Sequence, residues 1–384
     1  MCKYAFLFGR NPSLSYLELV SYLNARGIDF KPLIWFKEGV IAEIEKMDAE
    51  KLVKELAGTI KIAEVLFTCH TEELEQKLLQ ANLYEGTSNK LMYFVSAYNA
   101  NEMKIREILK RVFKEQRLKA VYKMLAPHTL AKKLQNYVDI IAVKEQKYYI
   151  AKTILCSDPH KFKERDEGRP FQEPEIMSSI RLSRILVNLS CTRPKATILD
   201  PFSGIGTVLQ EAMLLGYNVK GLELSEERVQ KSIANLEWVK KKYNIKQNFE
   251  VKKGDATMLS NYFEEERFDA IVTEPELGPL LKKLPTEKEA KETCGKLQKL
   301  YEKFFNEAKL VLKPEEKIVV VIPQFRTKNS RLFTINMDKI LHENGFRIFN
   351  ATENLPIKAG VPYLYKEEWH RIERLIYVLE KALK

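Results

Sequence analysis

The sequence lacks the features that mark membrane proteins and metal proteins. No apolar run approaches the length of a membrane-spanning helix, and the short apolar segment near the N-terminus is too brief for a signal peptide. The five cysteines show no C-x-x-C spacing, and the five histidines are isolated from one another. We therefore expect no metal site, no disulfide framework and no membrane insertion, and a reducing, cytoplasmic location.

The sequence has fewer acidic than basic residues. Lys and Arg number 63 against 52 for Asp and Glu, which gives a net charge of +11. A basic balance favours a polyanionic partner such as a nucleic acid, although a basic protein without such a partner has the same composition. With 384 residues, of which 45% are hydrophobic, the chain can form two or three domains, each with its own core.

The pattern of apolar and polar residues divides the chain into parts. Residues 1–55 predict a small α+β unit, and residues 56–155 add strands around a cationic helical stretch. The polar segment 156–170 is predicted to be a turn-rich linker. Over residues 171–384 strands and helices alternate, which is typical of a doubly wound α/β sheet of six parallel strands with an antiparallel edge. Its seven predicted strands are ATILD, NVKGLEL, FEVKKGD, FDAIVTE, KIVVVIP, FRIFNAT and RLIYVLE.

A glycine turn follows the first of these strands. Asp200 ends the strand, and Gly204 and Gly206 precede an apolar helix. Glycines let the backbone pass close to a ligand, and the N-terminus of the helix favours an anionic group. A dinucleotide site would require a third glycine, but that position is Leu209, so the pattern disfavours NAD.

Two further acids end the next two strands. Glu223 is placed to accept hydrogen bonds from ribose hydroxyls, and Asp255 can accept from the amine of adenine while the Ala256 N–H meets a ring nitrogen. Each acid alone could cap a helix or face water, but three at successive strand ends favour S-adenosylmethionine. The first acid would bind its amino group, and the glycines would face its carboxylate. Phe202 and Leu224, close to these acids, are assigned to the same site.

The segment TEPELGP follows the fourth predicted strand. The methyl group of S-adenosylmethionine is already activated, so the protein needs only to aim a nucleophile at it. An exocyclic amine is a poor nucleophile because its lone pair is delocalised into the ring. The Glu274 carboxylate and the Pro275 carbonyl can each accept one N–H and turn the lone pair toward the methyl carbon. Glu274 and Pro275 are therefore the candidate catalytic residues, and Glu274 also borders the cofactor.

Several segments together resemble a known family, the THUMP-containing tRNA guanine-N2 methyltransferases that modify guanosine 10. They are ERDEGRPFQEPEIMSSIRLSRIL, DPFSGIGTVLQEA, VTEPELGP, LAGTIKIAEVL and YYIAKT. The resemblance implies a ferredoxin-like piece over 1–55, a THUMP domain over 56–155 that binds the tRNA acceptor end, and a Rossmann-like class I methyltransferase domain over 171–384. It also implies that Phe171 covers the cofactor. The sequence does not show whether a small activating protein subunit takes part.

The loop departs from the usual family sequence, Asp-Pro-Pro-Tyr-Gly. Glu274 is longer than aspartate by one methylene, which would displace its oxygens by about 1 Å. Leu277 cannot stack on a base, an interaction worth about 1–3 kcal/mol, and Glu276 adds a second negative charge. Three hypotheses therefore stand: a tRNA guanine-N2 methyltransferase, a catalytically silent THUMP-type RNA-binding protein, and an adenine-N6 methylase.

Two groups of residues are the candidates for binding RNA. One group ends the THUMP-like region and the other follows the fifth strand of the methyltransferase sheet: Lys132, Lys133 and Asn136, then Arg326, Lys328 and Arg331. They would hold the phosphate backbone without reading bases, so affinity should fall steeply with salt. The cationic stretch from Lys104 to Lys123 is either a phosphate-binding helix or a solvated amphipathic one.

Overall fold

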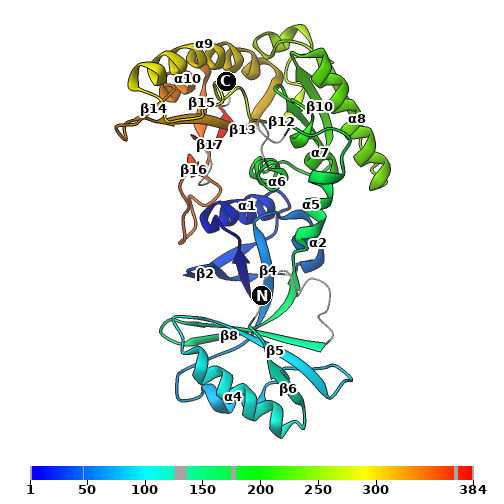
Figure 1. Cartoon of the computed structure of the whole chain (residues 1–384), viewed down its shortest axis with the longest axis vertical. Coiled ribbons are helices and arrows are strands. Elements are labelled where there is room, and N and C mark those ends of the chain that lie inside the picture. The colour runs from blue at the N-terminus through cyan, green and yellow to red at the C-terminus, as the bar shows by residue number, and fades with distance from the viewer. Residues whose placement is uncertain (1, 46, 125–135, 174–178, 367–370, 383–384) are drawn as a thin grey trace. The chain divides into compact units, whose positions relative to one another are not determined.

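The computed structural model forms two compact units (Figure 1). It describes residues 2–45, 47–124, 136–173, 179–366 and 371–382. The N-terminal unit comprises residues 1–16, 28–160 and 355–357, and the C-terminal unit comprises residues 17–27, 161–354 and 358–384. Among the described residues, no helix is long and apolar enough to cross a membrane.

One eight-stranded sheet runs through the N-terminal unit, in the order β2-β3-β1-β4-β8-β7-β5-β6. Its strands are β1 (Cys2–Phe8), β2 (Phe30–Phe36), β3 (Gly39–Ile44), β4 (Thr59–Cys69), β5 (Lys90–Tyr98), β6 (Lys119–Tyr122), β7 (Tyr137–Lys144) and β8 (Tyr148–Cys156). The helices of this part of the chain are α1 (Pro12–Asn24), α2 (Ala49–Glu55), α3 (Leu74–Gln80) and α4 (Glu102–Glu115). Because β1 pairs with β4, the strands of residues 1–55 and 56–155 belong to the same sheet.

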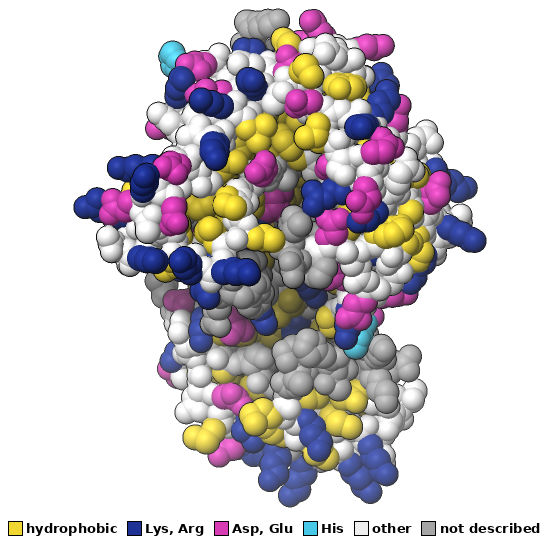
Figure 2. Space-filling model, turned by 45° about the horizontal axis from the view of Figure 1, so that its top comes forward, with side chains coloured by type: hydrophobic (Ala, Val, Ile, Leu, Met, Phe, Trp, Pro, Cys, Tyr) yellow, Lys and Arg dark blue, Asp and Glu magenta, His cyan; other side chains and the backbone are white. Residues whose placement is uncertain are grey.

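The cationic stretch forms the amphipathic helix α4. The Asn101 side chain accepts a hydrogen bond from the Lys104 N–H and so caps its first turn. Its buried residues recur at helical spacing and pack into the core of the sheet: Ile105, Ile108, Leu109, Val112 and Phe113. The opposite side carries exposed cations, and in Figure 2 Lys and Arg side chains gather over the end of the N-terminal unit that carries α4.

A nine-stranded sheet forms the C-terminal unit. Seven strands follow the order β11-β10-β9-β12-β13-β17-β15, while β14 pairs with β13 and β16 with β17. The strands are β9 (Thr197–Asp200), β10 (Asn218–Glu223), β11 (Phe249–Lys253), β12 (Phe268–Thr273), β13 (Leu312–Arg326), β14 (Leu332–Thr334), β15 (Phe346–Ile348), β16 (Tyr363–Tyr365) and β17 (Ile372–Lys381). The helices are α5 (Pro159–Gly168), α6 (Ile180–Leu189), α7 (Thr207–Leu214), α8 (Glu226–Lys242), the 3-10 helix η3 (Ala256–Asn261), α9 (Glu287–Val311) and α10 (Met337–Asn344).

All seven predicted strand segments form strands of this sheet, but two details of the prediction are wrong. The short strands β14 and β16 raise the count to nine. The antiparallel strand β17 lies between β13 and β15 and is not an edge, because it pairs antiparallel with both neighbours. Figure 1 shows α7 and α8 beside β10, and α9 and α10 near β13 to β15. Tyr301, Phe304 and Phe305 of α9 are fully buried in the core of this unit.

The segment predicted as a turn-rich linker, 156–170, instead contains the helix α5. Arg165 of this helix is 5% exposed and donates two hydrogen bonds to Glu211 of α7, at 2.9 and 3.2 Å. Arg184 of α6 also pairs with Glu211, 2.6 Å away. Glu211 is fully buried. Arg165 of this segment therefore takes part in a buried ion cluster that joins three helices.

Replacing Glu211 with alanine should lower the free energy of unfolding by about 3–5 kcal/mol, because two buried guanidinium groups would lose their counter-ion. Urea denaturation followed by circular dichroism measures this change. Glu167→Ala is the matched control, since its side chain is 66% exposed and pairs only with the exposed Lys163 among the ion pairs described. Equal stability of the two variants would show that the cluster contributes nothing.

Candidate active site

The carboxyl ends of four neighbouring strands bring the predicted acids to one edge of the sheet. The strands β11, β10, β9 and β12 are adjacent and parallel, with Gly221 opposite Asp200 and Glu223 opposite Lys253. Asp200 and Glu223 are the last residues of β9 and β10, while Asp255 and Glu274 follow β11 and β12. Ligands of open α/β sheets bind at this edge.

Asp200 is buried and is held from two sides. Its Oδ1 accepts hydrogen bonds from the Thr273 hydroxyl at 2.7 Å and from the Phe202 N–H at 3.2 Å. Burial raises the pKa of Asp200 to about 7; the two hydrogen bonds oppose this rise, and the charges of Glu223 and Glu274 add to it. A cationic ligand at this edge would favour the ionised carboxylate.

The glycine turn has the geometry that its residues predict. Gly204 and Gly206 both have positive φ, at 52° and 87°, which favours glycine. A Cβ atom on Gly206 would also lie 2.5 Å from the Ser232 hydroxyl, and α7 begins at the next residue. The Gly204 N–H donates to Glu223 at 3.0 Å, and the Ser225 N–H donates to the other oxygen of Glu223 at 2.9 Å. The turn therefore orients the second acid.

The third acid has a structural role as well. Asp255 accepts from the Thr257 N–H and hydroxyl, both at 2.8 Å, and caps η3, which is the alternative left open for it by the sequence. Ala256 beside it is buried. Leu224 is 69% exposed at the same edge and so is available to a ligand. Phe202 is partly buried and contacts Phe304 edge to face, so its ring belongs mainly to the core.

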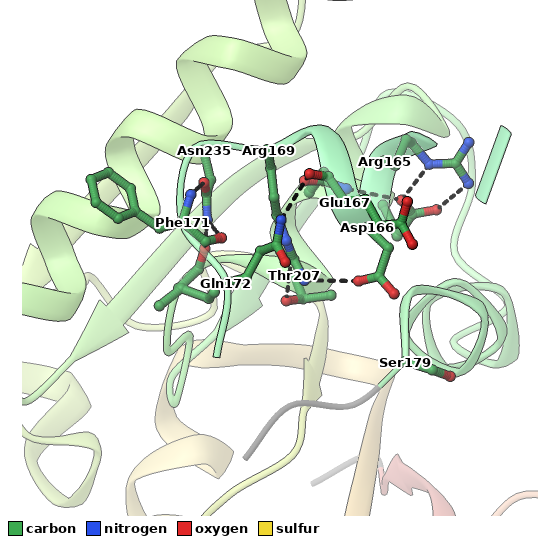
Figure 3. Close-up of polar contacts among 12 residues, drawn as sticks. Arg165, Asp166, Glu167, Arg169, Phe171, Gln172, Ser179, Thr207 and Asn235 are labelled. Atoms are coloured by element: carbon green, nitrogen blue, oxygen red, sulfur yellow. Dashed lines mark hydrogen bonds and ion pairs between the residues drawn. The ribbon is translucent and has the colours of Figure 1, made fainter. Parts of the chain in front are cut away.

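Phe171 is held against the glycine turn by Asn235, a residue that no sequence motif singles out (Figure 3). The Asn235 side chain accepts from the Phe171 N–H at 3.0 Å and donates to the Phe171 carbonyl at 3.1 Å. The same Asn235 amide donates to the Ile205 carbonyl at 3.0 Å. Arg169 reinforces the segment by donating to the Thr207 hydroxyl at 2.9 Å. Asn235 is fully buried, whereas Phe171 is 41% exposed.

The candidate catalytic loop begins directly after β12. The Arg374 Nε of β17 donates to Glu274 Oε1 at 2.7 Å, and the two side chains are 11% and 12% exposed. Pro275 is buried. The Tyr301 hydroxyl donates to the Glu276 carbonyl at 3.1 Å, and burial raises the pKa of Tyr301 well above its usual value. These contacts fix the loop backbone against α9 and the sheet.

The predicted RNA-binding residues of the N-terminal unit are only partly described. Lys132 and Lys133 lie outside the described residues. Asn136 is exposed, and its side chain accepts a hydrogen bond from the Tyr84 hydroxyl at 3.4 Å. Its position leaves it open to solvent, and its RNA contact stays a prediction.

The second predicted group begins at the last residue of β13. Arg326 contacts Glu373 through Nε at 3.0 Å and Nη2 at 2.9 Å, so its guanidinium is already part of an ion pair. Lys328 is exposed, and Arg331 is exposed and paired with Glu287 at 3.0 Å. These cations lie on the same unit as the acids. No group of acids, cysteines or histidines among the described residues could hold a metal ion.

A family model matches part of the C-terminal unit. Residues 167–347 match the family described as "RMKL-like, methyltransferase domain". This part of the chain is therefore similar to a methyltransferase domain, for which the sequence predicts S-adenosylmethionine as the cofactor. Three features of the site fit this cofactor: the acids Asp200 and Glu223 at adjacent strand ends, the glycine turn that orients Glu223, and the exposed Leu224.

Two curated relatives carry a more specific name, tRNA (guanine(10)-N2)-dimethyltransferase. The chain is 41% identical to that of Pyrococcus abyssi over 112 residues, which cover 29% of this chain and 32% of the relative. It is 27% identical to that of Methanothermobacter thermautotrophicus over 318 residues, which cover 82% of this chain and 87% of the relative. The alignment with the Pyrococcus protein thus spans about a third of that protein, whereas the second spans most of both chains.

A solved structure has the same architecture along the whole chain. TrmN from Thermus thermophilus matches with a TM-score of 0.55 at 16% identity, and the match covers 99% of this chain and 100% of that one. At this identity the likeness shows the fold alone.

Replacing Asn235 should weaken cofactor binding. In Asn235→Asp the two donated hydrogen bonds are lost and a carboxylate faces two carbonyl oxygens, so the Phe171 segment should detach from the glycine turn. We expect the Kd for S-adenosylmethionine to rise at least about tenfold by calorimetry, which corresponds to about 1.4 kcal/mol. Ser232→Ala is the control, because that buried residue of the same helix makes no described side-chain hydrogen bond. An unchanged Kd would contradict the role of Asn235.

Binding of S-adenosylmethionine should weaken as the pH falls below about 7. The raised pKa means that Asp200 is increasingly neutral below this pH, whereas an ammonium group requires the carboxylate, so binding must release a proton. The Kd of the wild type should rise by up to about tenfold per unit of pH in this range. The Kd of Asp200→Asn, measured in the same buffers, corrects for titration of the ligand. If both proteins show the same pH dependence, Asp200 does not bind the amino group.

Proposed function

We propose that the chain is an S-adenosylmethionine-dependent tRNA methyltransferase that acts on the exocyclic N2 amine of a guanosine, at tRNA position 10. The observation that carries the proposal is the position of Glu274-Pro275. It follows directly on Thr273, whose hydroxyl binds the cofactor acid Asp200 at 2.7 Å. The loop thus begins at the cofactor edge. The similarity to tRNA (guanine(10)-N2)-dimethyltransferase over 82% of the chain supports the substrate.

In this mechanism the loop orients an amine. The bound S-adenosylmethionine supplies an activated methyl group on its sulfonium. The Glu274 carboxylate accepts one N–H of the guanine amine and the Pro275 carbonyl accepts the other, so that the nitrogen lone pair points away from the ring plane. When the methyl group passes from the sulfonium to the nitrogen, Glu274 would accept the proton that the nitrogen loses and pass it on to solvent.

In this proposal the three acids at the strand ends bind different groups of the cofactor. Asp200 binds the amino group of the cofactor, Glu223 its ribose hydroxyls and Asp255 the amine of adenine. Phe171 closes over the site from the segment that Asn235 fixes. Phe202, Gly204, Gly206, Leu224 and Ala256 surround the same ligand.

The N-terminal residues serve to bind RNA in this proposal. A ferredoxin-like piece over 1–55 and a THUMP-type domain over 56–155 precede a connection over 156–170 and the methyltransferase domain over 171–384. Exposed lysines of α4 contact phosphates, as do the predicted groups around Lys132 and Lys328. The buried apolar face of α4 supports this use, because it leaves the cationic side to solvent. In this proposal the protein acts on tRNA in the cytoplasm.

The proposal is tested by measuring the modified nucleoside. Wild-type protein incubated with labelled S-adenosylmethionine and unmodified tRNA should form N2-methylated guanosine, identified by mass spectrometry at position 10. Glu274→Gln should lower kcat by about 10²–10⁴-fold, because the neutral amide is a weaker acceptor and cannot receive the proton. Binding of the cofactor and of tRNA should be retained.

The neighbouring exposed acid provides the control. Glu276→Gln removes the same charge from a side chain that points to solvent, and its activity should stay close to that of the wild type. Failure of the wild type to form any methylated base while it binds both ligands would indicate a silent RNA-binding protein. Methylated adenosine in place of guanosine would indicate an adenine-N6 methylase.

A further inference from the structure

The acid of the catalytic loop is held by a cation from a distant part of the sequence. Glu274 follows β12, and Arg374 is the third residue of β17, with β13 between these two strands. Arg374 lies opposite Pro323 of β13 and opposite Tyr365 of β16 in the sheet register. The guanidinium therefore reaches over the central strand β13 to meet the carboxylate at 2.7 Å.

The length of the Glu274 side chain is what allows this contact. The distance of 2.7 Å between Arg374 Nε and Glu274 Oε1 is that of a charge-assisted hydrogen bond. An aspartate on the same backbone would withdraw its oxygens by about 1 Å, which lengthens the contact with Arg374 beyond hydrogen-bond distance. Gly278, four residues farther along the loop, has a positive φ of 102°, and a Cβ atom added there would lie 3.0 Å from the Thr293 side chain and 3.2 Å from that of Phe325, so this end of the loop has little space in which to shift.

The ion pair between Arg374 and Glu274 is nearly buried, yet it leaves the carboxylate able to accept a further hydrogen bond. Both side chains are nearly buried, at 11% and 12% exposure, so neither charge could remain there without a partner. The charge of Glu274 adds to the rise in the pKa of Asp200, so the Glu274 carboxylate lies close enough to interact with a second acid of this edge. A carboxylate oxygen has two acceptor positions, so an oxygen that binds Arg374 can still accept an N–H from a ligand.

We propose that Arg374 is a positioning residue that fixes the Glu274 carboxylate in the orientation required to accept the N–H of the substrate amine. The inference rests on the proposed function, since it assigns a role to Arg374 in the same reaction. Arg374 does not touch the reacting atoms. It acts through Glu274, and the longer acid and the arginine form one functional unit.

Two single variants break the pair from opposite sides. Arg374→Gln removes the cation, and Glu274→Asp keeps the carboxylate but withdraws it from Arg374. Each should lower kcat by about 100-fold, the loss expected from a misplacement of about 1 Å, with the KM for tRNA and the Kd for S-adenosylmethionine little changed. Arg374→Lys, which keeps a cation, should recover part of kcat.

The double variant Glu274→Asp/Arg374→Gln shows whether the residues act together. Its kcat should fall no further than that of either single variant, because each change already disrupts the pair. Arg371→Gln is the control, since this exposed arginine precedes the same strand, and it should retain wild-type kcat. Thermal unfolding of each variant identifies any that fail to fold, and Glu274→Asp then serves alone, because it buries no new group.

The outcomes separate this inference from the proposed function. If the wild type forms N2-methylguanosine but Arg374→Gln and Glu274→Asp keep full kcat, the positioning role is wrong and the function stands. A higher kcat in Arg374→Gln would also overturn it, since the arginine would then restrain the carboxylate. If the wild type forms no N2-methylguanosine, the proposed function itself fails.

Discussion

The hydrogen bond from Thr273 to Asp200 links the two parts of the candidate site. Thr273 ends β12 and is fully buried, and its hydroxyl lies 2.7 Å from the acid that ends β9. Because β9 and β12 are adjacent parallel strands, their carboxyl ends lie side by side at the same edge of the sheet. Glu274 is the residue directly after Thr273. A shift of one strand against the other would change the position of the candidate catalytic loop relative to Asp200, so the register of this pair sets the geometry of the candidate site.

The edge gathers several carboxylates, and each is stabilised in a different way. Burial raises the pKa of Asp200 to about 7, so that near neutrality it carries only part of a charge. Glu223 accepts two backbone N–H groups, from Gly204 and Ser225. Glu274 binds a guanidinium. A cationic ligand would further stabilise the ionised form of these carboxylates. An acidic edge therefore suits a cofactor that carries a sulfonium and an amino group.

Features of the site with a local signal could be predicted from the sequence. The alternation of strands and helices gave all seven main strands, and the acids at their ends meet as expected. Gly204 and Gly206 have the positive φ that their turn requires. These features depend on residues close together in the chain, where hydrophobic period and turn chemistry are informative.

Features that depend on distant partners could not be predicted. The charged segment that forms α5 resembles a loop until Glu211, 46 residues after Arg165, is known to lie against it. The internal place of β17 follows from its pairing with β13 and β15, which no local pattern specifies. Asn235 likewise looks like an ordinary helix residue, although it is fully buried and joins Phe171 to the glycine turn.

The altered loop shows what this limit means for inferring function. Compared residue by residue with the usual family loop, glutamate in place of aspartate extends the carboxylate by one methylene, and the sequence alone suggests reduced activity. In the structure the reach of Glu274 is set by Arg374, a residue 100 positions later. The length of a candidate catalytic acid can be interpreted only together with the group that it contacts. An unusual residue in a motif is therefore evidence of lost activity only after its partner has been sought, and here the partner is a buried cation at hydrogen-bond distance.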